Sequence, residues 1–113
     1  MRTMSKSWTT TERAPRRKRL TPIHPGEILA EDLQDAEVSL NQLARSLRVP
    51  MNRISAIVNG RRSITADTAM RLARYFGTSP AYWMNLQTAY DLAVAEHTIR
   101  EQVDREVLPR RAA

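Results

Sequence analysis

The chain has 113 residues, which is enough for one domain with tails. It contains no cysteine, which excludes disulfides and thiolate metal sites, and no apolar run of the roughly 18 residues that a membrane span needs. The N-terminus also lacks the apolar segment of a signal peptide. We therefore expect a cytoplasmic protein with no membrane segment.

The net charge of +6 is unevenly distributed along the chain. Residues 1–22 contain seven lysines and arginines against one glutamate, and residues 39–76 contain seven arginines against one aspartate. Residues 23–38 contain five acids and no lysine or arginine, and residues 77–113 are nearly neutral. This segregation indicates an anionic partner for the two basic blocks and leaves room for a different partner elsewhere.

Residues 1–22 are polar and show no helical or strand periodicity, so they are predicted to form a basic, flexible N-terminal arm. The charge is densest at Arg16-Arg17-Lys18-Arg19. A solvated tail and a binding role are equally compatible with this composition.

The first helix is predicted at about 25–36, with His24 as its entry residue. Pro25 suits the first turn, where its missing N–H costs nothing. Acids suit the positive N-terminal end of a helix. Five acids occur in this region, and they are interpreted first as a solvated face and otherwise as a surface for a basic protein partner: Glu27, Glu31, Asp32, Asp35 and Glu37.

Two short helices follow. Ser39 and Gln42 have the spacing of a capping box and predict a helix at about 40–47. Pro50 ends it, because a proline disfavours helical geometry in the preceding residue. The next helix is expected from Pro50 or Met51 to Val58, ended by the left-handed cap that Gly60 permits. Two short helices with a tight connection predict a helix-turn-helix.

Two more helices are predicted. Thr65 caps the fourth, Gly77 stops it, and its buried side is expected to contain Ala69, Met70, Leu72, Ala73 and Phe76. Ser79-Pro80 starts the last helix, which is expected to run from 80 to about 106 because no breaker occurs before Pro109. The sequence thus predicts an all-α fold with five helices: a flexible arm at 1–22, a helix-turn-helix core at 23–78, and a C-terminal helix and tail at 79–113.

The long last helix has an apolar stripe that a single compact domain leaves exposed, and we expect a homodimer to cover it. The residues assigned to this dimer interface are Trp83, Leu86, Tyr90, Leu92, Ile99 and Val103. For Trp83 the helical spacing also allows a place in the core.

The second helix of the helix-turn-helix is predicted to face the major groove of DNA. Asparagine bonds adenine bidentately, while methionine and alanine pack on thymine methyl groups. The base-reading positions are therefore Met51, Asn52, Ser55 and Ala56, with a core role for Met51 left open. Phosphate contacts are assigned to Ser39, Gln42, Arg53, Asn59, Arg61 and Arg62.

The sequence contains no pattern that is typical of a catalytic or metal-binding site. There is no nucleophile elbow, phosphate-binding glycine loop or paired histidine motif. The two histidines, His24 and His97, lie far apart and show no ligand spacing. We therefore expect no enzyme activity, no cofactor and no metal.

The chain resembles the HigA family of antitoxins within the Xre and lambda-repressor-like helix-turn-helix group. The resemblance is found in 23-IHPGEIL-29, in 39-SLNQLARSLRVPMNRISAIVNGRRSITADTAMRLARYFGTSPAYWMNLQ-87 and in Tyr90-Asp91-Leu92, which together cover roughly two thirds of the chain. HPGE followed by NGRRSIT and FGTSPAYWMNLQ is far more specific than a bare helix-turn-helix. The arm and the C-terminal extension exceed the usual family domain.

The resemblance implies a five-helix lambda-repressor-like domain, a dimer, and repression of a palindromic operator. It also implies neutralisation of a HigB-type toxin, which is an mRNA-cleaving ribonuclease encoded beside the antitoxin. One alternative is a stand-alone Xre-family repressor without a toxin. Another is an adaptor whose helix-turn-helix mainly binds protein and whose basic arm binds RNA.

Overall fold

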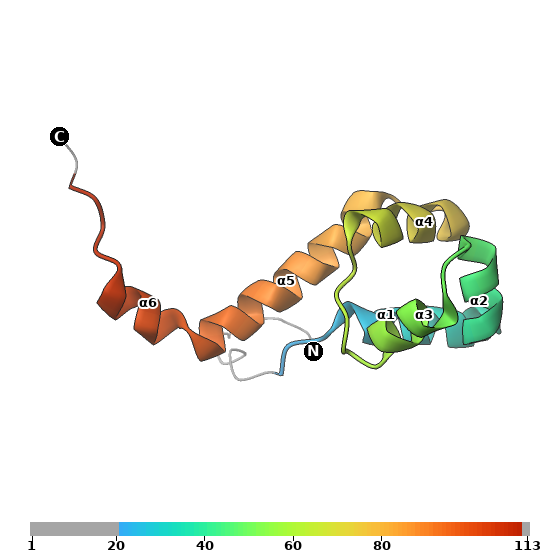
Figure 1. Ribbon diagram of the computed structural model, residues 1–113, viewed down its shortest axis with the longest axis horizontal. Coiled ribbons are helices and arrows are strands. Elements are labelled where there is room, and N and C mark those ends of the chain that lie inside the picture. The colour runs from blue at the N-terminus through green and yellow to red at the C-terminus, as the bar shows by residue number, and fades with distance from the viewer. Residues whose placement is uncertain (1–20, 112–113) are drawn as a thin grey trace, which may run out of the picture.

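The computed structural model of the chain describes residues 21–111, and within this range it contains six helices and no strand (Figure 1). The all-α prediction is confirmed. The helices are α1 (Pro25–Ala36), α2 (Leu40–Leu47), α3 (Met51–Val58), α4 (Ala66–Phe76), α5 (Pro80–Thr98) and α6 (Arg100–Glu106). Almost all of the predicted basic arm, including its densest charge, lies outside the described residues.

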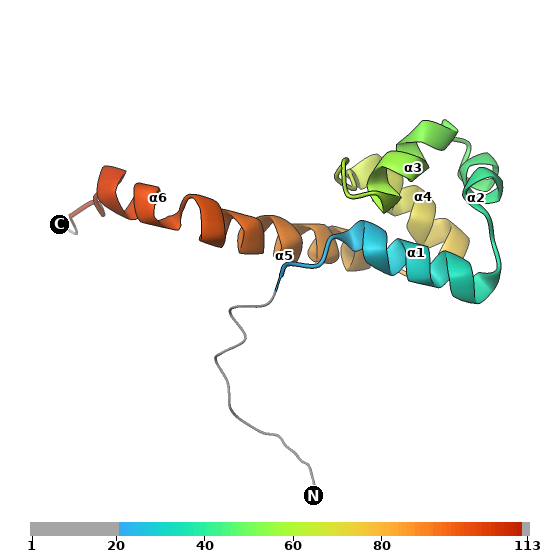
Figure 2. The ribbon, with the colours of Figure 1, turned by 90° about the horizontal axis from the view of Figure 1, so that it is seen from below.

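Four helices gather at one end of the molecule, and α5 leads away from them. Figure 2 shows α1 to α4 grouped at the end of the molecule where α5 begins, while the second half of α5 and all of α6 project from this group. The projecting part contains no buried residue: beyond Gln87, every side chain of α5 and α6 is half-buried or exposed. The chain therefore consists of a packed head and a protruding helical stem.

Local capping residues set the starts of the helices, as the sequence predicts. The hydroxyl of Ser39 accepts from the backbone N–H of Gln42 at 3.1 Å, and the Gln42 side chain accepts from the N–H of Ser39 at 3.5 Å. The hydroxyl groups of Thr65 and Ser79 likewise accept from backbone N–H groups in the first turns of α4 and α5, and Gly77 ends α4 at a φ of +75°. The predicted bounds of the first four helices are confirmed.

His24 connects the start of α1 to α5. Its Nδ1 accepts from the backbone N–H of Gly26 at 2.9 Å, which confirms it as the residue that caps the helix entry. The ring is buried and meets the ring of Tyr90 edge-on, with 4.8 Å between the centroids. The imidazole therefore serves α1 as a cap and α5 as a packing surface.

The hydrophobic core lies between α1 to α4 and the first turns of α5. Its fully buried side chains include Leu29, Leu43, Ile54, Ile57, Ile64, Leu72 and Trp83. Two predictions about it are wrong. Met70 is 64% exposed, because the buried side of α4 is formed by Thr68, Ala69, Leu72 and Ala73. Trp83 is a core residue of the single chain and not a dimer contact: α5 packs on α4 here, and the indole N–H donates to Thr78 Oγ1 at 2.9 Å.

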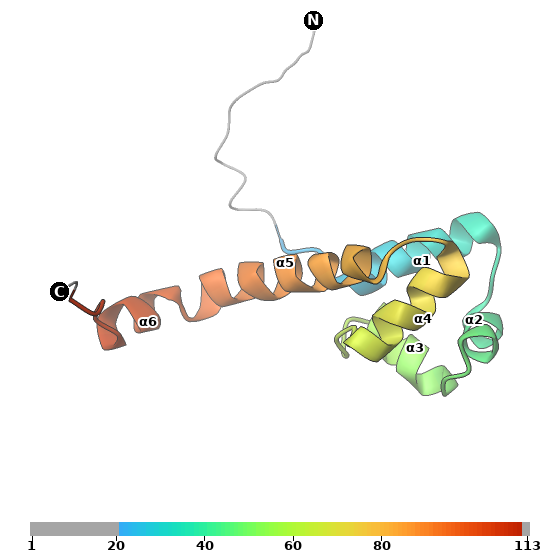
Figure 3. The same ribbon diagram turned by 90° about the horizontal axis from the view of Figure 1, so that it is seen from above.

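The predicted single helix at 80–106 is in fact two helices. Ile99 separates them with φ −128° and ψ 0°, and α6 continues beyond it (Figure 3). The break between the two helices has a local cause in the sequence. Thr98 and Ile99 are adjacent β-branched residues, and the Thr98 hydroxyl donates to the carbonyl of Val94 at 2.9 Å, a contact that bends helices.

None of the helices in residues 21–111 is both long and apolar enough to cross a membrane.

Gly26 is predicted to be indispensable for a steric reason. A Cβ at this position would collide with the backbone carbonyl of Ile57 in α3. We expect Gly26→Ala to lower the free energy of unfolding by about 2–3 kcal/mol, measured by urea denaturation, because neither backbone can move without disturbing the core.

Gly77→Ala is the matched control. This glycine has a φ of +75° but nothing within 4 Å of an added Cβ, so only backbone strain opposes the change, at about 1 kcal/mol. Equal losses of unfolding free energy in the two variants would show that the close contact with Ile57 is not what makes glycine necessary at position 26.

Candidate nucleic-acid interface

Helices α2 and α3 form a helix-turn-helix whose buried contacts fix the pair. The turn is Arg48-Val49-Pro50, and Arg48 adopts the left-handed conformation with a φ of +61°. The side chains between the helices are buried at Leu43, Ala44, Leu47, Ile54 and Ile57. Pro50, at the start of α3, makes no side-chain cap, and the N–H of Arg53 donates to its carbonyl at 3.0 Å, so the N–H groups of Met51 and Asn52 remain available to an acceptor such as a phosphate.

The four predicted base-reading residues lie outside the buried stripe of α3. Asn52 is exposed and Met51 is 41% exposed, which places Met51 outside the core. Ser55 and Ala56, one turn further along, are half-buried. The start of α3 therefore presents an amide and a thioether, followed by a hydroxyl and a methyl group.

The predicted phosphate-contacting residues, apart from Arg53, are exposed at the starts and ends of the two helices. In the capping box of α2, Ser39 Oγ and Gln42 Oε1 act as acceptors, so the hydroxyl hydrogen and the amide Nε2 hydrogens remain free to donate. Beyond α3, Gly60 has a φ of +77° and the N–H of Arg61 donates to the carbonyl of Ala56 at 2.8 Å. This bond holds the segment with Asn59, Arg61 and Arg62 against the end of α3.

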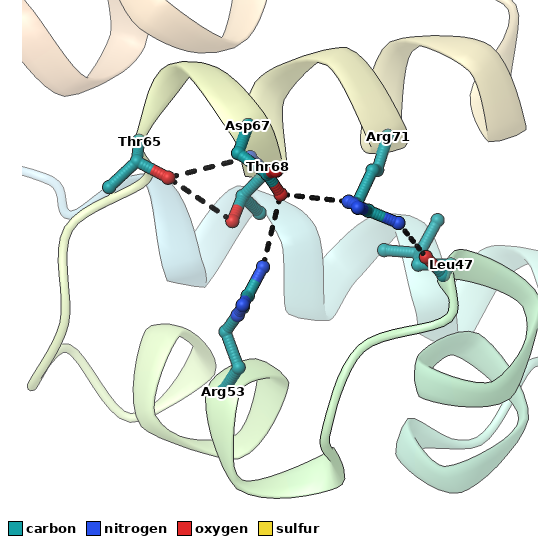
Figure 4. Close-up of polar contacts among 6 residues, drawn as sticks. All are labelled: Leu47, Arg53, Thr65, Asp67, Thr68 and Arg71. Carbon is teal, nitrogen blue, oxygen red and sulfur yellow. Dashed lines mark hydrogen bonds and ion pairs between the residues drawn. The ribbon is translucent and has the colours of Figure 1, made fainter.

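Arg53 has a partner inside the protein, shown in Figure 4. Its Nη1 donates to Asp67 Oδ1 at 3.1 Å, and the same oxygen accepts from Arg71 Nε at 2.8 Å. Arg71 Nη1 in turn donates to the backbone carbonyl of Leu47 at 2.8 Å. We call this set, Arg53, Asp67, Arg71 and the Leu47 carbonyl, the turn brace. It connects the end of α2, the first turn of α3 and the first turns of α4.

The two arginines of the turn brace stabilise the ionised form of Asp67. The hydrogen bond from Arg71 is the largest cause, and the charges of Arg71 and Arg53 add to it, so the pKa of Asp67 lies below its ordinary value of 3.8. A lowered pKa in the folded state means that the stabilisation is fully present above the ordinary value and is lost as the pH falls through the folded one. The turn brace is therefore charged throughout the neutral range.

The loop between α3 and α4 is fixed by a buried glutamine. Gln87 Oε1 accepts from the backbone N–H of Ile64 at 2.8 Å, and its Nε2 donates to Asp91 Oδ1 at 2.9 Å. The Gln87 side chain is only 3% exposed. Sequence reasoning assigned no role to Gln87, Asp67 or Arg71 at this site. The contacts that connect them to α2, α3 and the loop after α3 join residues 14 to 24 positions apart in the chain.

The remaining residues of the predicted dimer interface fall into two groups. Leu86 and Tyr90 are half-buried at the edge of the head, and Leu86 packs against the core. Leu92, Ile99 and Val103 are 65%, 47% and 37% exposed, and all three line one hollow of about 360 Å³ with Ala95, Glu96 and Arg100. We call this surface the stem stripe.

The acids of the first helix lie on the outside of the head. Glu27, Glu31, Asp35 and Glu37 are exposed, and Asp32 is half-buried. This face lies on α1, whereas the candidate DNA contacts come from α2, α3 and the loop after α3. The acids of the first helix and the candidate DNA contacts thus occupy different elements of the head.

The chain is similar to known helix-turn-helix proteins. Residues 29–83 match the helix-turn-helix family HTH_3. The structure of an addiction module antidote protein of a HigA family from Coxiella burnetii is 54% identical and covers 80% of this chain and 100% of that chain, with a TM-score of 0.76. The Pseudomonas aeruginosa antitoxin HigA, solved with the higBA promoter, is 46% identical over 78% of this chain and 97% of that chain, with a TM-score of 0.75. The virulence-associated protein I of Dichelobacter nodosus is 55% identical over 75 residues, which is 66% of this chain and 69% of that protein.

Proposed function

Since the chain belongs to the HigA family of helix-turn-helix proteins, we propose that it is the antitoxin of a type II toxin–antitoxin system. In this proposal it binds a palindromic operator as a homodimer and represses its own operon. It also binds and neutralises a HigB-type ribonuclease toxin. The alternative is a repressor of the same fold without a toxin partner.

The observation that carries the DNA-binding part is the outward face of α3. Ile54 and Ile57 form the buried side of α3, while Asn52 and Met51 are exposed in its first turn. An asparagine amide matches the donor and acceptor of adenine in the major groove, and the methyl groups of Met51 and Ala56 match thymine. Likeness to an antitoxin solved with promoter DNA supports this use of the helix.

Phosphate contacts come from residues around α3 and do not read sequence. We assign them to Arg61 and Arg62 after the glycine, to Asn59, and to the free donors of Ser39 and Gln42 at the start of α2. Their positions at both ends of the helix-turn-helix would set the register of α3 in the groove.

The stem stripe is the proposed dimer surface. Exposed leucine, isoleucine and valine side chains on one side of the projecting stem are unfavourable in water, and a second copy related by a two-fold axis would cover them. A two-fold dimer also presents two copies of α3 to one side of DNA, which suits half-sites about one helical turn apart.

The acidic face of α1 is the proposed contact for the toxin. HigB-type toxins are ribonucleases, and a protein that binds RNA needs a basic surface, which the exposed carboxylates of α1 complement. Because this face is separate from α3, toxin binding and operator binding can occur on one protomer.

The division between base reading and phosphate contact predicts different behaviour for two variants. Asn52→Ala is expected to lose about 1–3 kcal/mol of discrimination at the contacted base pair while keeping its nonspecific binding. Arg62→Ala is expected to weaken specific and nonspecific binding alike and to lower the slope of log K against log salt by about one. Fluorescence anisotropy with the protein's own promoter and a scrambled duplex measures both, and identical behaviour of the two variants would contradict the division.

The stem stripe predicts that a charge at its centre breaks the dimer. Ile99→Asp is expected to give a monomer at micromolar concentration in light scattering, because the carboxylate would be buried without a partner. His97→Asp adds the same charge at an exposed site off the stripe and should leave the dimer intact. A wild-type monomer at this concentration would contradict the dimer itself.

The antitoxin role predicts a specific partner in the neighbouring gene. Co-expression with that gene product is expected to give a complex that co-purifies and to rescue growth when the product alone is toxic. The acidic face predicts that a Glu31→Lys, Asp35→Lys double variant weakens the complex, while Asn52→Ala does not. Promoter binding without any toxic neighbour or complex would favour the stand-alone repressor.

A further inference from the structure

We propose that Asp67 and Arg71 are positioning residues for operator recognition, acting through the turn brace to hold the first turn of α3. This inference rests on the proposed DNA-binding function. It assigns the half-buried Arg53 to the ion pair with Asp67 within the head and removes it from the set of phosphate contacts.

The two ends of α3 are held very differently. At its C-terminal end, α3 packs on the backbone of α1 at Gly26, with a closeness that only glycine allows. At its N-terminal end, Pro50 provides no side-chain cap, and the residues that face outward are Met51 and Asn52. The end that presents the base-reading side chains is thus the end with the least packing, and it is where Arg53 reaches across to α4.

The turn brace spans the turn of the helix-turn-helix from both sides. Leu47 is the last residue of α2, and Arg53 lies in the first turn of α3, so the three-residue turn lies between the two points of attachment. Both attachments lead to α4, through Arg71 Nη1 at 2.8 Å and through Asp67 Oδ1 at 3.1 Å. With both points fixed to one rigid helix, the angle between α2 and α3 is fixed as well.

A single guanidinium makes this bridge possible. Arg71 donates from Nε to Asp67 and from Nη1 to the Leu47 carbonyl at the same time. A planar group with donors in a fixed fork can satisfy two acceptors in different directions, whereas the single ammonium of lysine is a compact charge without that geometry. The role of Arg71 is therefore separable from its charge.

The charges of the turn brace predict whether Asp67→Asn strengthens or weakens operator binding, and the direction of this change tests the proposal. If Arg53 contacted a phosphate, Asp67 would only compete with the DNA for it, and Asp67→Asn would tighten binding by freeing Arg53 and removing a negative charge. If Asp67 positions α3 through Arg53, the same variant weakens operator binding although it makes the protein more positive. Simple electrostatics and positioning thus predict opposite results.

The experiment compares Arg71→Lys and Asp67→Asn with wild type for binding to the promoter DNA across a salt series. We expect both variants to bind the operator about 3- to 10-fold more weakly, the effect of losing one or two net hydrogen bonds, with an unchanged salt slope. Glu101→Gln is the control, because it removes the same charge from an exposed position on α6 that lies outside the stem stripe. Tighter operator binding by Asp67→Asn would overturn the proposal.

Amide hydrogen exchange of the free protein provides a second readout that needs no DNA. The proposal expects faster exchange across Met51–Val58 in Arg71→Lys and Asp67→Asn, with α5 unchanged and with Glu101→Gln identical to wild type. Unchanged exchange in α3 would overturn the turn brace, even if DNA binding were weaker. Failure of the wild-type protein to bind its promoter would instead count against the proposed function, so the two failures are distinguishable.

Discussion

The contact between Gly26 and the end of α3 is the constraint on which the rest of the head depends. Because position 26 has no Cβ, the first turn of α1 lies directly on the backbone of Ile57 and Val58. His24 caps that same turn and packs on Tyr90, which brings α5 to the site. A short helix with only two buried side chains, Ile54 and Ile57, is thereby held by backbone contact instead of by a large apolar face.

The polar contacts extend this arrangement from one end of α3 to the other. The turn brace attaches the first turn of α3 and the last carbonyl of α2 to α4. Gln87 attaches the loop after α3, at Ile64, to α5. The exposed ion pairs contribute little to global stability, but they lie where packing is sparse and where a change in angle would move the outward residues. These ion pairs therefore serve mainly to fix the orientation of α3.

The sequence predicts the parts of this structure whose signals are local. Pro25, Ser39 with Gln42, Pro50, Thr65 and Gly77 each mark a helix end through residues within four positions of it, and most of the bounds from α1 to α4 follow from them. The break at Ile99 was missed because two β-branched residues lower helix propensity only slightly and Pro109 is the first strong breaker. Met70 and Trp83 were misplaced because helical spacing says which residues share a face, but not how wide the buried stripe is. Arg71 and Leu47 lie 24 residues apart, and no periodicity connects them.

The division between head and stem has a consequence for how the two kinds of contact can be combined. All the candidate DNA contacts lie in α2, α3 and the loop after them, whereas the stem stripe lies on α5 and α6, beyond the last buried residue of the head. A dimer joined through the stems would set the distance between the two copies of α3 through the length and bend of α5 and α6. The bend at Ile99 would therefore contribute to the distance between the two copies of α3. In the proposed dimer, half-site spacing would thus be a property of the stem, and base preference a property of the first turn of α3.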